Sequence, residues 1–226
     1  MSTGQPPRDD NEIRGAVIEP LVVASHSTRG FFDSLPPLAR GLVVLETLYT
    51  QVLRNGVMAF IEDEPRAFVE GVARACELLD ELDVGNMFAA VERAVEVRDG
   101  RLRLDLVASQ DASRALERYM AREQVDVRLI AQARASHALL APHVERAAAI
   151  CRERDELRAR EAEAERARLE AARDSARTWT LRERFAVGEI LSHAKFGLGE
   201  VIALAGGDKI QVRFADGAVR TLAHGR

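Results

Sequence analysis

Apolar residues recur every three or four positions over much of residues 31–124, which is the spacing that places them on one face of a helix. The stripe is clearest before Asn55-Gly56, two residues that favour the left-handed conformation in which many helices end. Similar stripes predict further helices after Pro65 and after Asn86. We therefore expect a helical domain in this part of the chain.

Two segments near this domain are less regular. Residues 1–30 join a polar, proline-bearing lead to an apolar stretch that contains Pro20. Because proline lacks the N–H that a helix interior or a central strand needs, we expect a flexible lead followed by an extended or broken piece. Leu102, Leu104 and Leu106 alternate with charged residues, which predicts either a short strand or the entry to a helix.

Residues 125–184 are rich in alanine, arginine and glutamate, and large aliphatic side chains become sparse in their second half. Strong helix formers and pairs such as Glu156 with Arg160 favour a solvated helix, although Pro142 is expected to kink or break it. We predict a charged helical connector here. Its apolar positions are too sparse for a sustained coiled coil, but a partial coiled coil would make a dimer.

β-branched residues, aromatic residues and glycine turns follow the connector. Apolar and polar residues alternate from Ile210 to Phe214, and Asp216-Gly217 is a strong signal for a tight hairpin. Four or five short strands are therefore predicted over 185–226, which suits a small SH3-like barrel. The expected fold class is α+β, mostly α: an N-terminal helical domain, a long charged helix and this C-terminal β module.

Composition narrows the class of protein. Hydrophobic residues make up 47% of the chain and charged residues 30%, and no apolar stretch approaches the roughly 20 residues that span a bilayer. The polar N-terminus does not read as a secretory signal, so we expect a cytoplasmic protein with no membrane partner. Cys76 and Cys151 are the only cysteines, which excludes a disulfide framework and zinc-type cysteine spacing.

Residues with catalytic potential are few and dispersed. The five histidines are scattered, and no local arrangement of Ser, His and Asp or of Cys and His indicates nucleophilic catalysis. The glycines of residues 196–199 lie between predicted strands and lack the lysine and the helix of a phosphate-binding loop. The paired acids at 62–64 and 80–83 are more typical of solvated helix ends than of cation ligands. We expect no enzyme activity, no cofactor and no metal.

The C-terminal strands carry a recognisable motif. A Gly-acid pair, a histidine and a Phe-Gly-x-Gly-x-Val turn precede a strand that ends in Phe-x-x-Gly. These positions are Gly188, Glu189, His193, Phe196, Gly197, Gly199, Val201, Val212, Phe214 and Gly217. The run resembles the Tudor/SH3-like module at the C-terminus of UvrD/PcrA-type repair helicases, and it shares the general glycine and valine pattern of CarD-type RNA polymerase-interacting domains.

The resemblance implies docking on RNA polymerase, with nucleic-acid contact as a secondary role. It carries over no ATPase activity, because nothing of the helicase motor is present. Lys195, Phe196, Arg213 and Arg220 are the candidate protein-binding residues of the module. Acidic residues among them make the surface too weakly basic for tight, sequence-independent DNA binding.

The N-terminal region carries a second resemblance. Residues 31–97 contain 12 acidic residues against 5 arginines. A helix that ends in Asn55-Gly56, an aromatic residue at Phe60 and a helix with Tyr119 resemble a family of bacterial helical domains typified by a DNA-mimic protein. The chain departs from the Asn-Gly-Gly-aromatic-Glu-Gln signature of that family. In this resemblance acids would stand in for phosphates, namely Glu62, Asp63, Glu64, Glu70, Glu77, Asp80, Glu81 and Asp83.

Three functional hypotheses follow. The leading one is a non-enzymatic adaptor whose β module docks on RNA polymerase or another nucleic-acid-processing machine. The second is a DNA-mimic antagonist, in which the acidic helical domain binds a basic DNA-binding protein. The third is a weak direct nucleic-acid binder.

Overall fold

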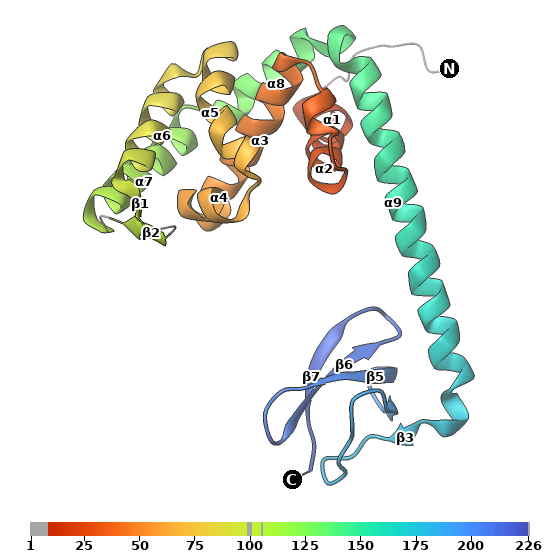
Figure 1. The fold of residues 1–226 in the computed structure, drawn as a ribbon. Helices are drawn as coiled ribbons and strands as arrows, with labels where there is room; N and C mark the ends of the chain where they lie inside the picture. Colours follow the sequence, from red (N-terminus) through yellow and green to blue (C-terminus); the bar gives the residue numbers. More distant parts are fainter. Residues whose placement is uncertain (1–8, 99–100, 105, 226) are drawn as a thin grey trace. The chain divides into compact units, whose positions relative to one another are not determined.

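The computed structural model describes residues 9–98, 101–104 and 106–225 and divides into two compact units, Met1–Arg152 and Glu153–Arg226. The first unit contains α1 (Asp10–Ile13), a π-helical turn (Arg14–Ile18), α2 (Glu19–Ser27), a 3-10 turn (Phe32–Ser34), α3 (Pro37–Asn55), α4 (Val57–Asp63), α5 (Arg66–Leu78), α6 (Leu82–Ala94), β1 (Val95–Arg98), β2 (Arg101–Leu104), α7 (Leu106–Arg122) and α8 (Val125–Ala135). The boundary falls within α9 (His137–Ala171). The second unit continues with a 3-10 turn (Arg173–Ser175), β3 (Arg177–Thr178), β4 (Ile190–His193), β5 (Gly197–Leu204), β6 (Lys209–Phe214) and β7 (Val219–Ala223) (Figure 1).

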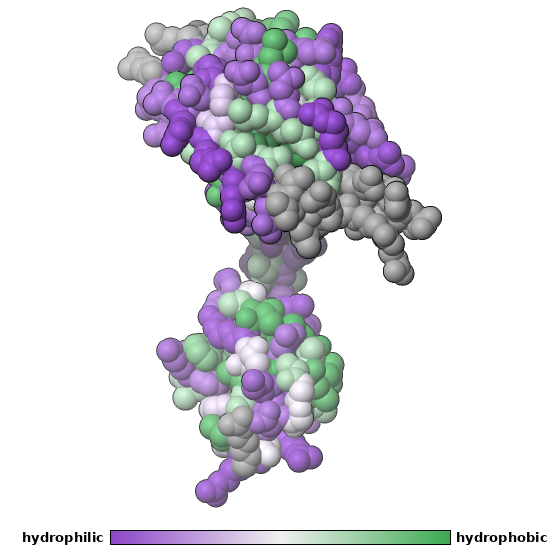
Figure 2. Space-filling view, turned by 90° about the vertical axis from the view of Figure 1, so that its left-hand side faces the viewer, coloured by the Kyte–Doolittle hydropathy of each residue, from purple (hydrophilic) through white to green (hydrophobic). Residues whose placement is uncertain are grey.

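The fold is mostly helical with a small mixed sheet, which confirms the predicted α+β class. Among the described residues, we find no helix that is both long and apolar enough to cross a membrane. Figure 2 shows hydrophilic side chains over much of the face that it presents, with a smaller apolar area on the helical unit.

Helix α3 is the centre of the first unit. It contacts α2, α4, α5, α7 and α8, and its side chains from Leu42 to Leu48 are buried. The helix ends as the sequence predicts, because Gly56 adopts a φ of +84° and its N–H donates to the carbonyl of Val52. Phe60, from α4, fills the same core and packs edge-on against Phe88 at 5.8 Å.

The apolar stretch before residue 30 is helical from Asp10 to Ser27, so the expectation of an extended or broken piece was wrong. Ile13, Val17 and Leu21 are buried on one side of α1, the π-helical turn and α2. The wider π turn comes just before Pro20, and the N–H of Glu19 donates to the carbonyl five residues back. A π turn shifts the hydrogen-bond register by one residue, and it lets the helix continue beside a proline that has no N–H.

The segment predicted as a connector is shared between the two units. Helix α8 buries Val125, Leu129 and Ala133 in the core of the first unit. Helix α9 continues through Pro142 without a break, and Leu140 and Ala147 are fully buried in the same core. The apolar stripe of this alanine-rich segment is therefore part of the core of the first unit.

Of the three alternating leucines, Leu102 and Leu104 lie in a strand, and Leu106 begins helix α7. Strands β1 and β2 pair antiparallel with Val95 opposite Leu104 and Arg98 opposite Arg101. The helix predicted after Asn86 ends at Ala94, and residues 99 and 100, between the two strands, lie outside the described residues.

The second unit is built on a five-stranded sheet in the order β3-β4-β5-β6-β7. The β3–β4 pair is parallel and the others are antiparallel. The sheet is open, so β3 and β7 are its edges and the predicted closed barrel is not seen. The alternation in β6 buries Val212 and Phe214 together with Leu191, Val201 and Phe185. Gly199 allows this packing, because a Cβ there would lie 2.8 Å from the Phe214 ring.

Candidate protein-binding surfaces

Four side chains lie one against the next beside the β4–β5 turn, close to the end of β3 and to β7. The Trp179 and His193 rings have centroids 4.6 Å apart, and the His193 and Phe196 rings are also 4.6 Å apart. The guanidinium of Arg220 lies over the Phe196 ring, 4.6 Å from its centroid. We call these four residues the aromatic column.

Local backbone geometry explains the column. The parallel β3–β4 pairing places Trp179 beside the end of β4. There the backbone N–H of Trp179 donates to the carbonyl of Ser192 at 2.9 Å. Gly197 has a φ of +78°, a conformation that lets the chain reverse direction in a tight turn after Phe196. The Phe214 ring lies 5.4 Å from Phe196, so the column continues into the core of the sheet.

The imidazole of His193 has a defined protonation state. Its Nδ1 accepts hydrogen bonds from the backbone N–H groups of Lys195 and Phe196 at 3.1 and 3.3 Å. Burial, and then the nearby Lys195 charge, lower the pKa of His193 below its ordinary value. The ring is therefore neutral at physiological pH, with its proton on Nε2.

One cation, Arg220, belongs to the column, and a second, Lys195, borders it. Arg220 forms two hydrogen bonds with the carboxylate of Asp216, at 3.0 and 2.7 Å, and these hold the pKa of Asp216 at about 2. The Lys195 ammonium lies 5.4 Å from the Phe196 ring and its side chain is exposed. Since Arg220 is already paired with Asp216, Lys195 contributes the positive charge that is open to a partner.

The structure brings together three of the four predicted contact residues of the module. Lys195, Phe196 and Arg220 lie at the aromatic column. Arg213 alternates with Val212 and Phe214, whose side chains enter the core, so its own side chain lies on the opposite face of the sheet.

Trp179 is the member of the column that the sequence analysis missed. Its indole Nε1 is buried and has no hydrogen-bond partner among the described residues. A signal was present, because Trp179 is the only tryptophan of the chain and lies between two threonines in a segment otherwise dominated by alanine, arginine and glutamate. Its contact with His193 depends on the parallel pairing of β3 with β4, which local patterns do not indicate.

The acidic candidates at the end of α4 do not all face solvent. Glu62 and Asp63 are exposed. Glu64 turns inward, with its side chain 7% exposed, and contacts His26 Nε2 at 2.7 Å and Gln51 Nε2 at 2.8 Å. His26 Nδ1 also lies 2.8 Å from the carbonyl oxygen of Val22. Glu64 therefore connects α2 to the α4–α5 turn.

The second acidic cluster is divided in the same way. Asp80 is exposed, but Glu81 is buried and bound by Arg128 through two hydrogen bonds of 2.6 and 2.7 Å. These bonds raise the pKa of Arg128. Helix α5 separates the two clusters by 13 residues, or about 20 Å. Each cluster therefore contains one acid that the fold buries, Glu64 in the first and Glu81 in the second.

Further acids of the helical unit are paired on its surface. Glu70 and Glu77, both on α5, form ion pairs with Arg66 and Arg74 at 2.6 and 2.8 Å. Asp83 accepts a hydrogen bond from the hydroxyl of Tyr119 at 3.1 Å. Pairing with arginine reduces the negative field that a DNA mimic would present.

A polar cavity of about 530 Å³ lies between α2 and α3. Arg14 and Glu46 pair across it at 3.0 Å, and burial raises the pKa of Glu46 in spite of that arginine. Over the described residues, no group of three or more His, Cys, Asp or Glu side chains is placed to hold a metal ion.

Comparison with known proteins gave no match to a family model, to a curated protein or to a solved structure.

Proposed function

We propose that this chain is a non-enzymatic interaction protein whose C-terminal unit docks on RNA polymerase or on another nucleic-acid-processing machine. The observation that carries the proposal is the aromatic column with Lys195 beside it. Tryptophan, other aromatic residues and arginine are enriched at the centres of protein interfaces, where a few side chains supply most of the binding energy. Here they gather on a small sheet together with an exposed cation.

The resemblance to the Tudor/SH3-like module supports RNA polymerase as the first partner to test. Several of its motif residues build the sheet: Gly199 admits Phe214, and Val212 lies in the core. His193 and Phe196 instead form the middle of the aromatic column. We interpret the open sheet as an SH3-like module, with this column as its docking surface.

The DNA-mimic alternative receives less support. Glu64 and Glu81, two of its candidate phosphate substitutes, are buried against His26 and Arg128. Direct DNA binding also receives little support, because Arg220 is paired with Asp216.

A matched pair of charge reversals tests the proposal. Lys195→Glu changes the cation beside the column, and Arg213→Glu changes an exposed cation on the opposite face of the same sheet. We expect Lys195→Glu to weaken the binding of the full chain to purified RNA polymerase at least about tenfold, and Arg213→Glu to change it less than about twofold. Biolayer interferometry at two salt concentrations measures both.

Fluorescence of Trp179, the only tryptophan, shows whether each variant keeps the column intact. Equal affinity of the two variants and the unmodified chain would contradict docking at the column. A stronger effect of Arg213→Glu would move the docking surface to the opposite face. A parallel titration with duplex DNA at low salt measures any direct nucleic-acid binding.

A further inference from the structure

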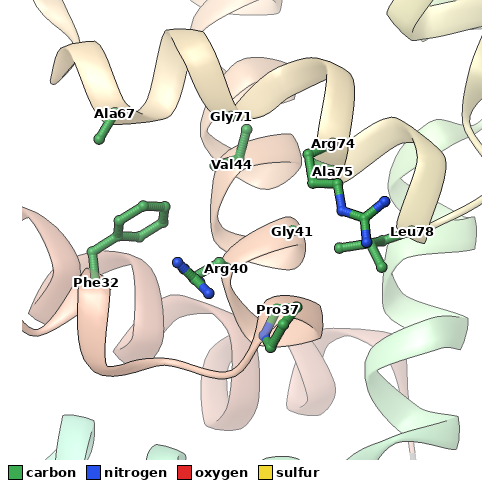
Figure 3. Close-up of a pocket in the computed structure, with 10 residues that line it drawn as sticks. All are labelled: Phe32, Pro37, Arg40, Gly41, Val44, Ala67, Gly71, Arg74, Ala75 and Leu78. Carbon is green, nitrogen blue, oxygen red and sulfur yellow. The ribbon is translucent and has the colours of Figure 1, made fainter.

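A groove of about 240 Å³ lies between α3 and α5 in the helical unit (Figure 3). Gly41, Gly71 and Ala75 line its floor, and Phe32, Val44 and Leu78 supply apolar walls. None of these residues belongs to the polar cavity between α2 and α3.

The floor is low because the two helices approach closely. A Cβ on Gly71 would lie 3.3 Å from the Val44 side chain, and one on Gly41 would lie 3.4 Å from Leu79. Along α5 the lining extends from Ala67 to Leu78, a length of about 16 Å or three helical turns. The result is an elongated apolar trough and not a round pocket.

Two arginines line the groove. Arg40, from α3, is partly buried and forms no ion pair within the described part of the chain. Arg74, from α5, pairs only with Glu77 three residues further along the helix, and both side chains are mostly exposed. Exposed pairs of this kind are weak, so a ligand carboxylate can replace Glu77. Figure 3 shows the two guanidinium groups arising from the two helices that flank the groove.

We propose that this groove binds an acidic amphipathic helix of a partner protein, with its apolar side chains on the floor and its carboxylates at Arg40 and Arg74. The volume is below the roughly 300 to 1,000 Å³ of typical small-molecule pockets, whereas the length matches three turns of a helix. Charge complementarity selects an acidic helix over a basic one. This site lies in the helical unit and does not depend on the function proposed for the C-terminal sheet.

Two fluorescein-labelled, alanine-based peptides of about 16 residues probe the groove. Both carry three leucines at positions i, i+4 and i+7, and they differ only in flanking glutamates or lysines. With the full chain, fluorescence anisotropy should give a Kd of about 10–100 μM for the acidic peptide and at least tenfold weaker binding for the basic one. Salt should weaken the acidic complex.

Matched variants locate the contact. Arg40→Glu combined with Arg74→Glu should reverse the preference between the two peptides, whereas Arg66→Glu, on α5 but outside the groove lining, should not. Ala67→Leu should obstruct the groove, and Ala73→Leu, at an exposed position outside the lining, is its control. Far-UV circular dichroism confirms that each variant is folded.

Three results would overturn the proposal. The first is equal affinity for the acidic and basic peptides, and the second is no saturable binding of the acidic peptide at about 1 mM. The third is binding of octanoate at Arg40 and Arg74 while the acidic peptide fails to bind, which would assign the groove to small carboxylates instead.

Discussion

The buried pair formed by Glu81 and Arg128 predicts an asymmetric loss of stability. The Glu81 side chain is 3% exposed, whereas that of Arg128 is 43% exposed. Removing the arginine leaves a carboxylate with little access to water. Removing the carboxylate leaves a guanidinium that water still reaches.

The magnitudes follow from these exposures. Loss of one partner from a fully buried pair costs about 3–5 kcal/mol. Because Arg128 is partly solvated, we expect the lower end, about 3 kcal/mol, for Arg128→Met. Glu81→Gln keeps the shape and leaves a solvated cation, so about 1 kcal/mol is expected. In a unit of this size each kcal/mol shifts Tm by about 2–4 °C, which gives shifts of about 6–12 °C and 2–4 °C.

Two spectroscopic signals separate the units in this assay. Far-UV circular dichroism follows mainly the helices of the first unit, and fluorescence of Trp179 follows the second. Thermal unfolding of both single variants and the double variant completes a double-mutant cycle, with an expected coupling above about 1 kcal/mol. The reasoning is refuted if Glu81→Gln costs as much as Arg128→Met, or if the two losses are additive.

Three further predictions concern single side chains. Gly199→Ala would place a Cβ 2.8 Å from the Phe214 ring, so we expect the unfolding free energy of the second unit to fall by about 1–3 kcal/mol. Urea unfolding followed by tryptophan fluorescence measures this, and an unchanged midpoint would contradict the packing. Burial raises the pKa of the Cys76 thiol to about 12, so at pH 8 a thiol reagent should modify the partly exposed Cys151 first, and mass spectrometry of the labelled peptides identifies the site. Burial also raises the pKa of Glu46 above its ordinary value of 4.5, so ionisation of this carboxyl destabilises the fold. As the pH rises from about 4 to 7, the unfolding free energy of Glu46→Gln should therefore increase relative to that of the unmodified chain. Urea unfolding of both proteins at the two pH values checks the sign.

The elements that the sequence predicts best are those with strong local signals. Helix α3 follows from its apolar stripe and from Asn55-Gly56, and Gly56 has the positive φ that such an ending requires. Strand β6 follows from its alternation, with Val212 and Phe214 inside. The fold class follows from the change of composition after the long charged segment.

The elements that the sequence misses depend on distant contacts. Strand β3 is two residues long and is defined by pairing with β4, so no local period indicates it. The burial of Glu64 and Glu81 depends on partners at His26 and Arg128, 38 and 47 positions away. A run of acids therefore looks solvated in the sequence even where the fold pairs its members.

Helix α9 shows how composition along one element reflects two environments. Near its start, Leu140 and Ala147 are buried in the core of the first unit. Near its end, Arg168 forms ion pairs with Glu165 and with Glu200 of β5, within the second unit. The residues between are mostly exposed, and surface pairs such as Glu156 with Arg160, 3.7 Å apart, contribute little. The middle of α9 is therefore held mainly by helix propensity, because alanine, arginine and glutamate are all good helix formers. The two hydrophobic cores share no residue, so we expect variants in the α3–α5 groove and in the aromatic column to affect different units of the full chain.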